Sequence, residues 1–141
     1  MARMSFTIPG PPMGKPTWSK SDRWRPRERI LKMHSWKDWA WYCLGGQELP
    51  AAETTINIWF RAYFAPPSSL SRVKQEALIG TLKRTKPDGD NIEKCVCDTF
   101  WKNDQALGDQ HITRRFDWEP RLEIEIEYED SAEPAVMAVA A

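Results

Sequence analysis

Two segments of the chain alternate apolar and polar residues with a period of two, and they constrain the fold more than any other feature. Residues 54–64 read TTINIWFRAYF, and residues 121–129 read RLEIEIEYE. This period is typical of β-strands that turn one face to the core. Residues 4–8 and 112–118 predict two further strands. In the second long segment every other residue is glutamate, which we interpret as a solvent face that discourages pairing at a sheet edge.

Three helices are predicted between these strands. The first is expected after Ser35 and Asp38, which resemble a capping box, and the second after Ser71, a good N-cap residue. The third is indicated by apolar residues at helical spacing from Ile92 to Thr99. The predicted ranges are 36–44, 72–79 and 92–99.

This order of elements predicts one domain of the α/β (α+β) class, with a mixed sheet of four to five strands flanked by helices. A chain of 141 residues is long enough for one core. We expect the domain to span residues 1–130 and the weakly patterned residues 131–141 to form a disordered tail.

The composition argues against a membrane or secreted protein. No apolar stretch approaches the length of a membrane helix, and the N-terminus lacks the apolar core of a signal peptide. The cysteines at 43, 95 and 97 form no disulfide or zinc framework, so we interpret them as buried thiols. We therefore expect a cytoplasmic protein with no membrane partner and no small-molecule cofactor.

Charge is unevenly distributed, although the formal net charge is zero. Nine basic and two acidic residues lie up to Lys37, whereas fourteen acidic and five basic residues follow Pro87. Such asymmetry is expected if one surface binds a polyanion and another carries metal-binding carboxylates, although solvated faces would also explain it. The candidate DNA-binding residues are Lys15, Lys20, Arg23, Arg25, Arg27, Arg29 and Lys86, of which the first six lie on a Pro-rich loop that suits a mobile binding arm. Trp18 or Trp24 on this loop could stack on DNA bases, although each is as easily a core residue.

The stretch KPDGDNIEKCVCDTFWKNDQALGDQHI, residues 86–112, contains six acidic residues. Pro87 disfavours helix before Asp88, so Asp88 and Asp90 are predicted to be extended and to project to the same side. Lys94 follows one helical turn after Asp90, and a returning chain can bring Asp109 to the same place. Three carboxylates and a lysine suit a Mg²⁺ site that hydrolyses phosphodiesters. The alternatives are a helix cap, a turn or a solvated acidic surface.

The same residues resemble the RusA family of Holliday junction resolvases, whose signature is D-x-D-N-x-x-K followed by an aspartate about fifteen residues beyond the lysine. The resemblance runs from about residue 4 to 128 and includes the opening FTIPGPPMGKP. It implies Asp88, Asp90 and Asp109 as catalytic metal ligands and Lys94 as the essential lysine. Two departures stand beside these ligands, because Gly89 replaces a common leucine and Gly108 replaces the first aspartate of a D-D pair.

The resemblance further implies a Mg²⁺-dependent homodimer, with Mn²⁺ as the alternative metal, of a kind often encoded by phages or prophages. Such enzymes resolve four-way DNA junctions by paired symmetric nicks. Three alternatives remain open from the sequence: a junction-binding module with a vestigial metal site, a nuclease for other branched DNA, and a protein-interaction domain with a solvated acidic surface.

Overall fold

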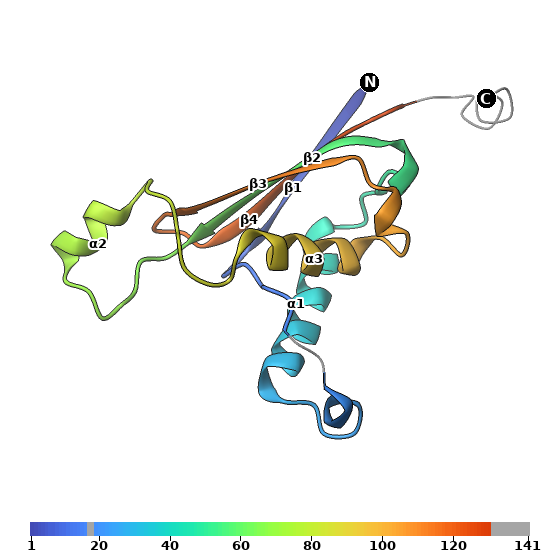
Figure 1. The fold of residues 1–141 in the computed structure, drawn as a ribbon. Helices are drawn as coiled ribbons and strands as arrows, with labels where there is room; N and C mark the ends of the chain where they lie inside the picture. Colours follow the sequence, from blue (N-terminus) through green and yellow to red (C-terminus); the bar gives the residue numbers. More distant parts are fainter. Residues whose placement is uncertain (17–18, 131–141) are drawn as a thin grey trace, which may run out of the picture.

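The computed structural model describes residues 1–16 and 19–130. The predicted tail and Trp18 lie outside these residues. The elements, in chain order, are β1 (Ala2–Pro9), η1 (Lys20–Arg23), α1 (Glu28–Leu44), η2 (Ala52–Thr54), β2 (Thr55–Phe64), α2 (Arg72–Leu78), α3 (Gly89–Phe100), η3 (Asp104–Ala106), β3 (Asp109–Phe116) and β4 (Arg121–Tyr128) (Figure 1).

The four strands form one mixed sheet in the order β1-β4-β2-β3, which confirms the predicted fold class. β4 pairs antiparallel with β1 and with β2, whereas β3 pairs parallel with β2. The parallel pair needs a crossover connection, and α2 and α3 lie in it. The site residues are therefore carried by the connection between two neighbouring parallel strands.

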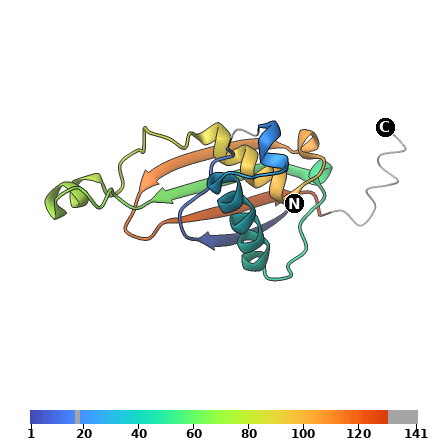
Figure 2. The same cartoon turned by 90° about the horizontal axis from the view of Figure 1, so that it is seen from below.

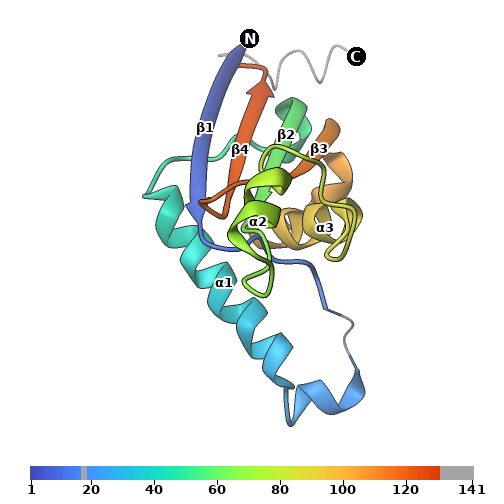
Figure 3. The ribbon, with the colours of Figure 1, turned by 90° about the vertical axis from the view of Figure 1, so that its left-hand side faces the viewer.

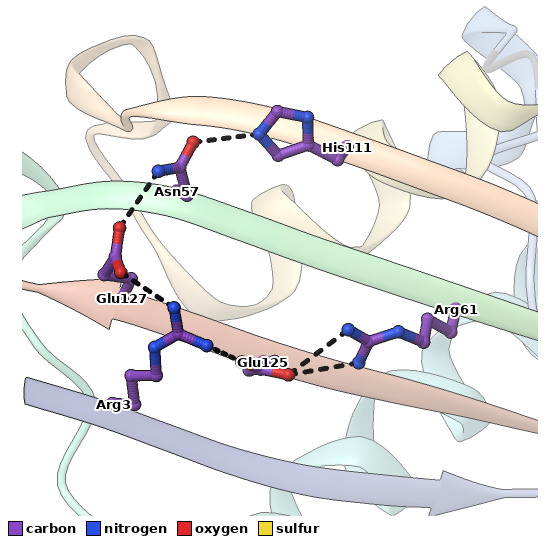
Figure 4. Close-up of polar contacts among 6 residues, drawn as sticks. All are labelled: Arg3, Asn57, Arg61, His111, Glu125 and Glu127. Carbon is purple, nitrogen blue, oxygen red and sulfur yellow. Dashed lines mark hydrogen bonds and ion pairs between the residues drawn. The ribbon is translucent and has the colours of Figure 1, made fainter.

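The glutamates of β4 do not lie on an edge strand, so our explanation for them is wrong. β4 is an inner strand, and its glutamates lie on the sheet face that the helices leave uncovered. There, Glu125 accepts hydrogen bonds from Arg3 at 2.8 Å and from Arg61 at 3.2 Å. Glu127 accepts from Arg3 at 3.1 Å and from Asn57 at 3.0 Å (Figure 4). The glutamates of β4 thus link β4 to β1 and to β2 through cross-strand polar pairs.

The core lies between the opposite sheet face and two helices. α1 and α3 lie side by side on this face (Figures 2 and 3), whereas α2 projects from the body beyond one end of the sheet (Figures 1 and 2). Ile58, Phe60 and Ile124 are buried from the sheet, and Ile92 and Val96 are buried from α3. No residue of α2 is buried. Among the described residues, no helix has both the length and the apolarity needed to span a membrane.

Helix α1 begins eight residues earlier than predicted. It starts at Glu28 after Arg27 and ends where Gly45 adopts a φ of 68°. Ser35 and Asp38 therefore lie inside the helix, and the predicted capping box is wrong. The helix extends because its buried face begins before residue 36; the buried residues, at helical spacing, are Ile30, Met33, Trp36, Ala40 and Leu44.

The cysteines form no disulfide. Cys95 and Cys97 are buried on α3, as predicted, and Cys43 on α1 is half-buried. Burial raises the pKa of the Cys95 thiol to about 11 and that of Cys97 to about 12, so both are neutral thiols at physiological pH. Cys95 and Cys97 accordingly act as small apolar core residues.

Candidate active site

The N-terminal end of α3 carries two of the predicted catalytic carboxylates. Asp88 is the N-cap, and its Oδ1 accepts a hydrogen bond from the Asn91 backbone N–H at 2.9 Å. Asp90 already lies in the first helical turn. Asp88 is extended, as predicted, but Gly89 and Asp90 are helical, because Pro87 stands before the cap and leaves the helix free to start at Gly89. Capping uses one oxygen of Asp88 and leaves the other to a further ligand.

Lys94 lies beside Asp90, as the spacing predicted. Its Nζ is 3.0 Å from the Asp90 Oδ2, one turn along the helix, and both side chains are exposed. The hydrogen bond to Asp90 raises the pKa of Lys94, and the nearby charge of Asp88 adds to the effect. The lysine is thus cationic throughout the neutral range, next to two carboxylates.

A small cavity of about 180 Å³ opens beside this pair. It is lined by a third aspartate, Asp104, for which the sequence predicted no role. Asp104 begins η3, the short turn that brings the chain back from α3 to β3. The lining residues are Asp90, Glu93, Lys94, Cys97, Asp104 and Gln110. Burial and the neighbouring Asp90 raise the pKa of Glu93, so carboxylates are crowded on this side of α3.

Asp109 is not among the residues that line the cavity. It is the first residue of β3, and the following Gln110 contacts Cys97 of α3 at 3.6 Å between its Oε1 and the cysteine Sγ. His111 instead hydrogen-bonds to Asn57 at 2.9 Å on the uncovered sheet face (Figure 4). Because side chains alternate along a strand, Asp109 shares the face of His111. The catalytic role of Asp109 stays a prediction.

The donor chemistry of the site fits a hard divalent cation. Asp88, Asp90 and Asp104 offer carboxylate oxygens, which Mg²⁺ and Mn²⁺ prefer. In the described part of the chain, however, no three His, Cys, Asp or Glu side chains are grouped closely enough to hold a metal ion as they stand. Asp90 is paired with Lys94 instead. Binding a cation would therefore require small side-chain rearrangements around α3.

The structure explains both glycine departures. A Cβ added at Gly89 would lie 2.8 Å from the Ile112 Cγ2. The Ile112 side chain on β3 therefore fills the space that a side chain at position 89 would need. A Cβ at Gly108 would lie 2.3 Å from the Ile56 carbonyl oxygen. The backbone around Gly108 passes too close to β2 for any side chain. Neither glycine removes a charged group from the cavity.

Arg114 holds the segment that leads into Asp88. Its Nη1 donates to the carbonyl oxygens of Thr85 and Pro87, each at 3.0 Å. Backbone hydrogen bonds from Lys83 to the Arg114 carbonyl and from Phe116 to Thr81 tie the same segment to the end of β3. The guanidinium thus fixes the Pro87 carbonyl, which directly precedes the Asp88 cap, and the Thr85 carbonyl two residues before it.

Replacing Arg114 by alanine should slow catalysis at this site by roughly ten- to a hundredfold, the range for losing a group that orients a metal ligand. The fold should persist, because the backbone bonds of residues 80–83 remain. Cleavage rates and thermal unfolding followed by circular dichroism would test this. The matched control is Arg115→Ala, which removes the same charge from the neighbouring residue, whose guanidinium binds the Gly80 carbonyl instead. An equal loss in both variants would refute the positioning role.

Residues 19–27, here called the basic arm, carry four of the predicted DNA-binding residues and fold around a buried carboxylate. Asp22 is 2% exposed and accepts hydrogen bonds from Ser19 and from the backbone and side chain of Arg27. The Arg27 hydrogen bonds lower the pKa of Asp22 far below its usual range. Arg27 is thereby engaged with Asp22, whereas Arg23 lies 5.6 Å from the ring of Trp24, which is 80% exposed.

The other predicted DNA-binding residues are spread over several elements. Lys20 and Arg23 lie on η1 and Arg29 on α1, so the predicted loop contains two helical segments. Lys15 forms an ion pair with Asp98 of α3. The residues Lys20, Arg23, Arg25, Arg29 and Lys86 are exposed.

Comparison with known proteins identifies the family. Residues 9–127, most of the 141, match the family model described as endodeoxyribonuclease RusA. None of the curated proteins compared with the chain matches it. Family members are endonucleases that act on branched DNA junctions and generally depend on a divalent metal. The fold, the Asp88–Asp90–Lys94 arrangement and this match agree, and the chain therefore belongs to the RusA family of endodeoxyribonucleases.

Proposed function

We propose that the protein is a Mg²⁺-dependent Holliday junction resolvase that cuts four-way DNA junctions by paired symmetric nicks, as a homodimer. The observation that carries the proposal is the Asp90–Lys94 pair beside the Asp88 cap, at the start of α3 and next to a cavity with further carboxylates. An exposed group of two carboxylates and a cation is poorly explained by stability, because surface ion pairs contribute little to it.

The aspartates and the lysine of the site would have different roles. Asp88, Asp90 and a third aspartate would hold the metal, which when bound would stabilise negative charge on the scissile phosphate as a Lewis acid. Lys94, cationic and held by Asp90, would neutralise charge on the same phosphate or orient the attacking water. The free N–H groups and dipole of α3 also favour an anionic phosphate at this end of the helix.

The third metal-binding aspartate can be identified by experiment. The resemblance points to Asp109, whereas the cavity contains Asp104. From the geometry we expect Asp104→Asn to reduce cleavage on the order of a hundredfold, as losing a charge-stabilising group does, and Asp109→Asn to reduce it much less. Single-turnover cleavage of a synthetic junction at saturating Mg²⁺ and Mn²⁺ would measure both. The reverse order of effects would assign the ligand to Asp109.

A homodimer accounts for paired nicks. A four-way junction has an approximate two-fold axis, so two identical subunits present identical sites to two strands of like polarity. The basic arm around Asp22 would lie along the junction arms and contact phosphates, with Trp24 available to stack at the branch point.

The test of the proposed function compares a synthetic mobile four-way junction with a linear duplex, a three-way junction and a flap. We expect Mg²⁺-dependent cutting of the four-way junction above all. A supercoiled plasmid with an extruded cruciform separates paired from single cuts, because paired cuts give linear DNA and single cuts give nicked circles. Preferential cutting of the flap or three-way junction would assign another branched substrate. Junction binding without cutting would favour a binding module with a vestigial site.

A further inference from the structure

A groove lined by lysines lies beside the N-terminal end of α3. It consists of two adjoining cavities of about 370 Å³ and 400 Å³ that share Pro12, Lys86 and Pro87. Lys15 lines the first cavity, and Lys83 lines the second. Among the described residues, no acidic side chain lines either cavity. This distinguishes the groove from the acidic cavity on the other side of the helix start.

One wall of the groove is the loop that follows β1, and it is fixed to α3. The Lys15 backbone N–H donates to the Asn91 carbonyl at 3.1 Å. Gly14 lies so close to Pro87 that an added Cβ would be 2.7 Å from the proline Cβ. The wall therefore exists before any ligand binds.

The floor of the second cavity is aromatic. Phe64 and Phe116 line it, and the Lys83 ammonium lies 5.0 Å and 5.7 Å from their ring centroids. The same ammonium donates to the Thr85 hydroxyl at 2.6 Å. A cation above apolar rings can bind an anion while the rings contact an unpaired base.

Two of the three groove lysines differ from Lys15 in their charge partners. Within the described part of the chain, neither Lys83 nor Lys86 forms an ion pair with a carboxylate. Burial and the nearby Arg114 lower the pKa of Lys83, which means that they destabilise its charged form. A bound anion would stabilise that charged form. Lys15 is the exception, because it pairs with Asp98.

We propose that this groove binds one DNA strand, unpaired at the branch point, with phosphates on Lys83 and Lys86 and with a base against the half-buried Phe116 ring. The inference rests on the proposed function, since the strand is the one to be cut. Positive grooves with aromatic floors are how proteins bind single strands without sequence preference. Pro87 lines the groove and directly precedes Asp88. A strand in the groove is thereby led to the candidate active site.

The test uses a fluorescent single-stranded oligothymidylate and a four-way junction, both in EDTA so that binding is separated from cleavage. The double variant Lys83→Gln/Lys86→Gln should bind both probes at least about tenfold more weakly and linear duplex almost normally. The slope of log affinity against log salt for the single strand should fall by about 1.4, the value for two lost phosphate contacts. Lys86→Gln alone, at an exposed residue, should lower it by about 0.7.

The matched control is Lys32→Gln/Lys74→Gln, which removes two charges outside the groove. Unchanged strand affinity in the groove variants would overturn the inference, and so would an equal loss in the control or an equal loss for linear duplex. If wild-type protein fails to cut the junction in Mg²⁺, the proposed function falls. If the wild-type protein cuts the junction and the groove variants bind normally, only the strand-binding role of the groove is refuted.

Discussion

Replacing Asp90 by asparagine should reduce junction cleavage on the order of a hundredfold or more while junction binding remains. Asparagine keeps the size of the side chain and removes its charge. The change therefore removes a candidate metal ligand and leaves Lys94 without its partner at 3.0 Å. Both effects act on the charge that develops at the scissile phosphate. Folding should be little affected, because the pair is exposed.

The measurement is single-turnover cleavage of a synthetic junction, beside binding of the same junction in Ca²⁺. Asp38→Asn is the matched control, since it removes one exposed carboxylate from α1. Lys94→Ala should also abolish nicking and leave binding largely intact. Wild-type cleavage by Asp90→Asn would remove this residue from the proposed site. Equal losses of binding and cleavage in Lys94→Ala would show a purely electrostatic role for the lysine.

The sheet was predictable because its strands have one buried face. In β4 and in β2 from Ile58 onward, the apolar residues of the sequence alternation are the more buried ones, whereas at the start of β2 a register shift buries Thr55 and leaves Ile56 half-buried. The order of the strands was not predictable, because pairing depends on the crossover between β2 and β3. The position of β4 inside the sheet follows from that order, and it changes the role of its glutamates from edge protection to cross-strand pairing.

Helix α1 shows where local signals mislead. Ser35 and Asp38 have the composition of a cap, yet the buried stripe begins at Ile30, before them. Asp22 organises the segment before the helix through local contacts, because Ser19 and Asp22 form a capping box and Arg27 is five residues away. The apolar stripe that packs in the core therefore extends the helix past the signal at Ser35.

The contact between Asp90 and Lys94 was predictable from the sequence, whereas the identity of the third aspartate at the site was not. Asp90 and Lys94 are four residues apart on one helix, so their contact follows from helical geometry. Which aspartate returns to them depends on how η3 turns back toward β3, and this places Asp104 at the cavity. Gly89 likewise has a reason only in three dimensions, because Ile112 fills the space of its missing side chain.

Gly108 is a position where even alanine should destabilise the fold. An alanine Cβ there would lie 2.3 Å from the Ile56 carbonyl oxygen and 2.6 Å from that of Thr55. Both neighbours are backbone atoms of β2 and cannot rotate away, and the Gly108 N–H is held by the Thr55 hydroxyl at 2.8 Å. Gly108→Ala should therefore lower the free energy of unfolding by roughly 1 to 3 kcal/mol, the range for overpacking that forces a backbone shift.

Urea unfolding followed by circular dichroism would measure this loss, and Gly46→Ala gives the contrast. Gly46 has a φ of 78° and no heavy atom within 4 Å of an added Cβ, so alanine there incurs only backbone strain of about 1 kcal/mol. Gly108 has no positive φ, so a loss in Gly108→Ala that exceeds the loss in Gly46→Ala reflects the steric clash and not backbone strain. If Gly108→Ala unfolds at the wild-type urea concentration, the close approach to β2 is wrong. Because Gly108 lies between Asp104 and Asp109, the placement of both aspartates would then need revision.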